Sequence, residues 1–188
     1  MAPAPPTPPA SADFPETALI TLRLPGSLPA AVTRALKAEL RAAHAAGLDE
    51  HRTRKQLFAR FDAALDLGTG SGPRYLGEEK IAEVVAAEFE MLPETGFLVP
   101  GFVIRPNHAH VLVQLPAPSR LSFAKSLDLL QQRTEAAGRR LVRPRLHPET
   151  PFWQPGWHEV PLREAAELAR ALAYVRAQSR QDWPFRNG

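Results

Sequence analysis

Residues 102–113 constrain the fold of this chain more than any other segment. They read Phe-Val-Ile-Arg-Pro-Asn-His-Ala-His-Val-Leu-Val, two apolar runs separated by Pro106-Asn107. Apolar runs on either side of a Pro-Asn pair are typical of two β-strands joined by a tight turn. Because strand side chains alternate between faces, His108 and His110 point to the same face of the second strand. The segment therefore predicts a sheet that presents two imidazoles side by side.

The rest of the chain alternates between strand and helix patterns, which predicts a compact α+β fold with an antiparallel sheet flanked by helices. A length of 188 residues suits one domain. Residues 1–16 hold six prolines and predict an extended tail, which leaves residues 17–188 as the domain. We expect Ser27 to cap the first helix. The expected strands are 17–24, 96–105, 109–115 and 157–162, and the expected helices are 29–46, 50–67, 78–91, 121–141 and 163–180.

Composition limits the chemistry. The chain has no cysteine, so a metal ion here must be held by histidine, carboxylate or amide groups, and this composition suits a reducing cytosol. No apolar run approaches the roughly 18 residues needed to span a membrane, and no secretory signal is visible. The glycine-rich segment 68–73 follows no strand and lacks a Gly-Lys-Ser/Thr sequence, so we interpret it as a flexible loop and not a phosphate cradle.

Positive charge is concentrated in the last third of the chain. Residues 1–119 carry 11 Lys/Arg against 13 Asp/Glu, whereas residues 120–188 carry 12 against 7, and 11 of those 12 are arginine. The planar guanidinium group suits phosphate contacts. A solvated basic helix face is the alternative interpretation. The candidates for contacts to a nucleic-acid backbone are Arg133, Arg139, Arg140, Arg143 and Arg145.

The last helix carries a tyrosine away from its apolar face. Leu168, Leu172 and Val175 form the inward stripe, and Tyr174 lies roughly 120° from the middle of that stripe. Gln178 follows one turn later on the same side. A tyrosine at a helix edge and a hydrogen-bonded histidine pair are the structural alternatives. Together, however, two imidazoles, an amide oxygen and a phenol suit metal-assisted attack on a phosphodiester, with Mg²⁺ or Mn²⁺ polarising the phosphate.

Several ordered motifs over residues 17–188 resemble the REP-associated tyrosine transposases, the single-tyrosine branch of the HUH (His–hydrophobic–His) DNA-processing enzymes. Residues 104–113 are similar to that family's signature V-M-P-N-H-V-H-x-L-V, and residues 19–29 resemble its first strand and turn. The remaining matches are Phe152-Trp153-Gln154, Arg163-Glu164, Ala173-Tyr174-Val175 and Asp182-Trp183-Pro184-Phe185.

The resemblance implies a ferredoxin-like fold and cleavage of single-stranded DNA beside a hairpin. His108, His110 and Gln178 would hold Mg²⁺ or Mn²⁺, and Tyr174 would attack the phosphate. The products would be a 5′-phosphotyrosine and a free 3′-hydroxyl group. Arg105 and Asn107 join the candidate nucleic-acid contacts. A cytoplasmic bacterial protein acting on nucleoid DNA, as a monomer or homodimer and without a membrane partner, is the corresponding expectation.

Three positions depart from the family pattern. Arg105 replaces the methionine before Pro-Asn-His, Gln178-Ser179-Arg180 replaces Asn-Pro-Val, and Gln131 replaces a helix lysine. Two alternatives therefore stay open. One is a catalytically degraded, domesticated protein that binds hairpin nucleic acid. The other is a metal-dependent hydrolase in which Tyr174 is only structural.

Overall fold

The computed structural model describes residues 14–68, 70–91, 96–147 and 149–182, with the side chains of 179–182 excepted. The predicted tail thus lies largely outside the described residues, although Glu16 already belongs to the first strand. The strands are β1 (Glu16–Arg23), β2 (Leu98–Arg105), β3 (His108–Leu115) and β4 (His158–Leu162). The helices are α1 (Ala30–Ala45), α2 (Glu50–Asp66), α3 (Glu79–Glu90), α4 (Phe123–Val142) and α5 (Ala165–Asp182), with short 3₁₀ turns η1 (Tyr75–Gly77) and η3 (Arg143–Arg145).

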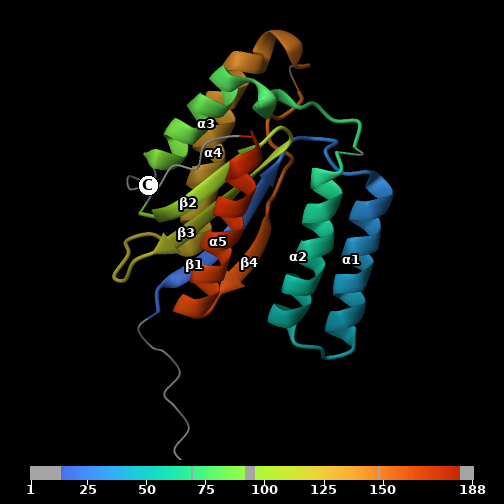
Figure 1. The fold of residues 1–188 in the computed structure, drawn as a ribbon, viewed down its shortest axis with the longest axis vertical. Helices are drawn as coiled ribbons and strands as arrows, with labels where there is room; N and C mark the ends of the chain where they lie inside the picture. The colour runs from blue at the N-terminus through green and yellow to red at the C-terminus, as the bar shows by residue number, and fades with distance from the viewer. Residues whose placement is uncertain (1–13, 69, 92–95, 148, 183–188) are drawn as a thin grey trace, which may run out of the picture.

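The four strands form one antiparallel sheet in the order β2-β3-β1-β4. Helices α3 and α4 cover one face of this sheet, and α5 crosses the other (Figure 1). This order, with a helical connection after β1 and another after β3, is the ferredoxin-like arrangement. The predicted α+β fold with an antiparallel sheet flanked by helices is confirmed.

Both faces of the sheet are buried, which explains why its strands are nearly continuous apolar runs. Ala109 and Val111 belong to the core that α3 and α4 complete. Leu112 belongs to the second core, where it packs with Val175 of α5. Since faces alternate along a strand, His108 and His110 lie on the α5 side of the sheet.

Helices α1 and α2 form a hairpin that stands beside β4 at the edge of the sheet (Figure 1). Leu28, Phe61 and Leu65 form a small core of their own under this hairpin. Asp49 caps α2, because its side-chain oxygen accepts a 2.7 Å hydrogen bond from the amide of Arg52. The position of the hairpin beside β4 brings one face of α2 over the α5 side of the sheet.

The expectation that Ser27 caps the first helix is wrong. The N-cap of α1 is Pro29, which provides no side-chain hydrogen bond. The amide of Ser27 instead bonds to the carbonyl of Leu24 at 3.2 Å, so Ser27 belongs to the turn that follows β1. The helix begins only after this turn is complete. Among the described residues, no helix has the length and apolar character needed to cross a lipid bilayer.

The glycine-rich segment packs tightly against the turn after β1. The amide of Gly72 donates a 3.0 Å hydrogen bond to the carbonyl of Gly26. A Cβ atom on Gly72 would lie 2.2 Å from the carbonyl oxygen of Pro25, and one on Gly70 would lie 2.3 Å from that of Gly26. These two glycines therefore permit the backbone of the glycine-rich segment to approach the backbone of the turn closely. The interpretation of this segment as a flexible loop did not include this packing.

Gly72→Ala should lower the free energy of unfolding by about 2 kcal/mol, because neither backbone can move aside without disturbing the turn. Gly77→Ala is the matched control, since a Cβ atom there would lie 3.5 Å from Cβ of Pro106, an ordinary contact. Urea unfolding followed by circular dichroism compares the two variants. Equal stabilities would contradict the close packing of this loop.

Candidate metal and tyrosine site

The two histidines of β3 are buried side by side, with ring centroids 4.7 Å apart. Nδ1 of His110 lies 2.9 Å from Oγ1 of Thr21 on β1. Nδ1 of His108 lies 2.8 Å from Oδ1 of Asn107 in the β2–β3 turn. One nitrogen of each ring is thus occupied by a neighbouring side chain, which fixes the ring orientation. The Nε2 atoms of both rings remain available to a shared partner.

A carboxylate from α2, that of Asp62, faces the Nε2 atoms of both rings. The sequence analysis did not identify this residue. Oδ1 of Asp62 lies 2.8 Å from Nε2 of His110 and 3.9 Å from Nε2 of His108. One ligand atom from each of these three residues lies within 4.8 Å of the others, close enough to hold a metal ion. Two imidazoles and a carboxylate are a donor set that divalent metals accept.

The surroundings of His108 show whether these residues suit a metal ion. Its Nε2 atom is buried and has no hydrogen-bond partner among the described residues. An unpaired buried nitrogen costs free energy, and so such atoms are rare in folded proteins. A cation bound to Nε2 would satisfy it. The residues present therefore fit a metal ion.

The sequence did contain a signal for Asp62. Phe58, Phe61, Asp62 and Leu65 follow the spacing i, i+3, i+4, i+7 that marks the buried face of a helix. A carboxylate at an otherwise apolar position of such a face needs a partner inside the protein. Phe61 and Leu65 are buried as expected, and Asp62 is buried with them.

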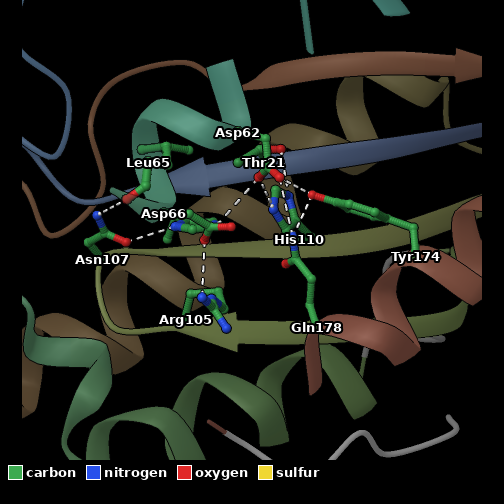
Figure 2. A network of polar contacts seen from close by, with 10 residues as sticks. Thr21, Asp62, Leu65, Asp66, Arg105, Asn107, His110, Tyr174 and Gln178 are labelled. Atoms are coloured by element: carbon green, nitrogen blue, oxygen red, sulfur yellow. Dashed lines mark hydrogen bonds and ion pairs between the residues drawn. The ribbon is translucent and has the colours of Figure 1, made fainter. Parts of the chain in front are cut away.

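Tyr174 and Gln178 of α5 reach the same carboxylate from the opposite side (Figure 2). The hydroxyl of Tyr174 donates a hydrogen bond to Oδ2 of Asp62. Nε2 of Gln178 lies 3.2 Å from the same oxygen and 2.5 Å from the Tyr174 hydroxyl. The fold thus brings together His108, His110, Tyr174 and Gln178, which the sequence analysis selected from segments more than sixty residues apart.

Gln178 presents its amide nitrogen, and not its oxygen, to Asp62 and Tyr174. Its Oε1 atom is buried and has no hydrogen-bond partner among the described residues. A half-turn of the amide group would exchange the two atoms and bring Oε1 to the carboxylate and the phenol. The role of Gln178 as a metal ligand stays a prediction.

Burial and the neighbouring groups set the charge states of this cluster. Burial, and next the nearby His110, hold the pKa of His108 well below its usual value, so its ring is neutral at pH 7. Burial opposes ionisation of Asp62, but the hydrogen bonds from His110 and Tyr174 outweigh it and lower the pKa of that carboxyl. Burial and the hydrogen bond to Asp62 raise the pKa of Tyr174 above its usual value. The arrangement is a neutral imidazole, a carboxylate and a protonated phenol.

A second polar contact joins the two helices that supply Asp62 and Tyr174. Glu167 of α5 accepts hydrogen bonds from Lys55 and, at 3.1 Å, from His51, both on α2. Its other oxygen accepts the amide of Arg163 at 2.7 Å. Burial opposes its ionisation, but these hydrogen bonds lower the pKa of Glu167 to about 2. Glu167 therefore ties α2 to α5 beside the site.

Glu167→Gln should lower the free energy of unfolding by about 2 kcal/mol at pH 7, because it removes hydrogen bonds to a charged acceptor. The native pKa of about 2 lies below the ordinary glutamate pKa of 4.5, so the ionised group stabilises the fold above pH 4.5. This contribution disappears as the pH falls from 4.5 towards 2. Denaturant unfolding of both proteins across this range measures it. A stability difference that does not change with pH would contradict the assignment.

Arg105 and Asn107 lie next to the histidine pair and contact the end of α2. Nδ2 of Asn107 donates a 3.0 Å hydrogen bond to the carbonyl of Leu65, and its Oδ1 holds His108. Arg105 is mostly buried and pairs with Asp66 at 3.2 Å. Both residues therefore fix the β2–β3 turn against α2 (Figure 2). Their contact with nucleic acid stays a prediction.

The five arginines selected as candidates for contacts to a nucleic-acid backbone lie away from the histidine pair, on α4 and η3. Helix α4 packs on the sheet face opposite to the histidine pair. Arg140 and Arg143 are exposed there. The other three already have partners: Arg133 pairs with Glu88 at 3.0 Å, Arg139 with Glu135 at 3.7 Å, and Arg145 with Glu78 at 2.6 Å. The structure does not bring this group together with the histidines and Tyr174.

Comparison with solved structures reveals a similar chain. A REP-associated tyrosine transposase bound to a REP hairpin superposes with a TM-score of 0.51, over 98% of this chain and 81% of that one. This likeness supports the fold. At 12% sequence identity it indicates a distant structural relationship. No protein-family model and no curated protein matches the sequence.

Proposed function

We propose that this chain is a metal-dependent single-stranded DNA endonuclease and strand transferase of the transposase type. It would act near DNA hairpins through a 5′-phosphotyrosine intermediate. The observation that carries the proposal is the meeting of the Tyr174 hydroxyl with His108, His110 and Asp62 in one buried cluster. The likeness to a transposase bound to a REP hairpin supports the choice of substrate.

The metal ligands in this proposal are Nε2 of His108, Nε2 of His110 and a carboxylate oxygen of Asp62. Gln178 would add its amide oxygen as a further ligand once a half-turn of its amide group exchanges the oxygen and nitrogen positions. We propose Mg²⁺ or Mn²⁺, which accept imidazole, carboxylate and amide donors together with water. When bound, the ion polarises the scissile phosphate and stabilises the charge that develops on the leaving oxygen.

The chain itself supplies the nucleophile and the group that receives its proton. The Tyr174 oxygen forms a bond to phosphorus, and the bond between phosphorus and the 3′-oxygen breaks. The hydroxyl proton of Tyr174 already points at Oδ2 of Asp62. The phosphotyrosine is itself a phosphodiester, with an ester bond to the tyrosine oxygen in place of the bond to the 3′-oxygen, so a 3′-hydroxyl group can later displace the tyrosine and join the strands. This exchange conserves the number of phosphate esters and needs no external energy source.

The proposal also includes contacts between this chain and the sugar–phosphate backbone of the DNA. Arg105 and Asn107 would meet the strand beside the site, and Arg133, Arg139, Arg140, Arg143 and Arg145 would contact phosphates further away. Arg140, Arg143 and Arg145 are the exposed members of this second group.

A gel assay with two labels tests the proposal. A 3′-labelled hairpin oligonucleotide should produce an SDS-resistant labelled protein band with Mn²⁺ or Mg²⁺. The same oligonucleotide labelled at its 5′ end should produce a shorter free fragment ending in a 3′-hydroxyl group. Both products should disappear with EDTA and in His108→Ala.

The second candidate is a hairpin-binding protein that has lost catalysis. The hydrogen bond that holds the Tyr174 hydroxyl on Asp62 favours it, because a phenol with a raised pKa is a poorer nucleophile at neutral pH. Tight binding of the hairpin on a native gel, without either labelled product at any metal concentration, would establish this candidate and refute the first.

A further inference from the structure

We propose that a cleft next to the histidine pair binds one nucleotide of the single-stranded substrate, adjacent to the phosphate that is cleaved. This inference rests on the proposed function. The cleft measures about 310 Å³ and lies between the α1–α2 hairpin and the strands β1 and β4. Pockets of this size accept one small molecule, so the cleft suits a single unpaired nucleotide and excludes a duplex.

The register of the sheet places the cleft one strand away from the candidate metal ligands. Thr21 of β1 lies opposite His110 on one side and His158 of β4 on the other. Arg23 lies opposite His108. Opposed residues in an antiparallel sheet share a face, with their Cβ atoms about 5 Å apart. Thr21 and Arg23 both line the cleft, and Thr21 also contacts Nδ1 of His110.

The charges that line the cleft are complementary to a phosphate group. Arg23 and Lys37 are its cations, and no carboxylate of the described residues lines it. Neither cation forms an ion pair within the part of the chain that the structure describes. Arg23 is half-buried, and this burial lowers the pKa of its guanidinium group. A desolvated guanidinium without an anion is unfavourable, and a phosphate oxygen would relieve that cost.

Aromatic rings line the same cleft. The rings of Phe61 and His158 are stacked with centroids 4.5 Å apart, and Trp157 also lines the cleft. Burial lowers the pKa of His158 to about 4, so this ring is neutral at pH 7. Nucleobases stack on aromatic side chains of this kind with little dependence on sequence. The lining thus combines cations that suit the phosphate of a nucleotide with apolar and aromatic side chains that suit its base.

A crosslinking and binding experiment tests this inference with the full chain. The probe is a fluorescent single-stranded oligothymidylate in which one thymine is replaced by 5-iodouracil. We expect Lys37→Glu and Arg23→Gln each to weaken binding by about tenfold at low salt. Lys80→Glu should leave binding within about twofold, since this exposed control lies on α3, across the sheet. Ultraviolet crosslinks in the unmodified protein should map to the segment that contains Trp157.

The crosslink does not depend on how well any variant folds. Equal binding by Lys37→Glu and Lys80→Glu, or crosslinks that map only to other segments, would overturn the inference. If the phosphotyrosine adduct forms but the cleft variants bind normally, the cleft inference alone fails. If cleft variants lose binding and the unmodified protein forms no adduct, the proposed reaction fails and the nucleotide site stands.

Discussion

Tyr174→Phe should abolish the covalent protein–DNA adduct and reduce strand cleavage by about 10³-fold or more. The substitution removes only the hydroxyl that attacks phosphorus and leaves the ring in place beside Phe58 and His110. The rate of adduct formation with 3′-labelled DNA, measured with protein in excess, is the quantity to compare. Binding of the hairpin should change little, because the phosphate contacts lie on other residues.

Tyr75→Phe is the matched control, since the chain contains only these two tyrosines. Tyr75 lies in η1, where Arg145 is placed over its ring, and the ring survives the substitution. This variant should form the adduct at the normal rate. Retained metal-dependent cleavage in Tyr174→Phe would show that water is the nucleophile, and the protein would then be a hydrolase.

Asp62→Asn should weaken Mn²⁺ binding by about 10²-fold and reduce cleavage accordingly. The amide keeps the size of the side chain but has no negative charge to hold a cation next to the two imidazoles. Titration calorimetry of the purified protein with Mn²⁺ measures the affinity without DNA.

Asp66→Asn is the control for this change, because Asp66 lies one turn later on α2 and pairs with Arg105 outside the candidate ligand set. It should bind Mn²⁺ normally. Gln178→Ala in the same titration compares the contribution of Gln178 to metal binding with that of Asp62. A large loss in Gln178→Ala together with normal affinity in Asp62→Asn would contradict the role of Asp62.

Hydrophobic patterning was sufficient to predict most of the fold. Strands 102–105 and 109–113 are buried on both faces, and their apolar runs are visible without any structure. The second of these strands was expected to begin at residue 109. Strand β3 begins at His108 instead, because the turn contains only Pro106 and Asn107. The helix expected to end at residue 141 extends to Val142, so Arg139 and Arg140 lie within its last turn.

The candidate site was only partly predictable, because its members come from three elements. His108 and His110 share a strand face, and Tyr174 and Gln178 share a helix face, so local periodicity identifies each pair. Asp62 depends on how the α1–α2 hairpin stands against the edge of the sheet. Local sequence shows that this carboxylate needs a buried partner but does not reveal that the partner is His110, 48 residues later. The cleft between the hairpin and β4 arises from the same tertiary packing.

Mass spectrometry of the trapped protein–DNA adduct tests whether Tyr174 is the nucleophile. After reaction with hairpin DNA and Mn²⁺, nuclease trimming and digestion with trypsin, the nucleotide should remain on one peptide. Cleavage after Arg170 and Arg176 releases Ala-Leu-Ala-Tyr-Val-Arg, in which Tyr174 is the sole hydroxyl-bearing side chain. We expect a nucleotide phosphate on this peptide. A metal-dependent adduct on any other peptide, or cleavage without an adduct, would contradict this expectation.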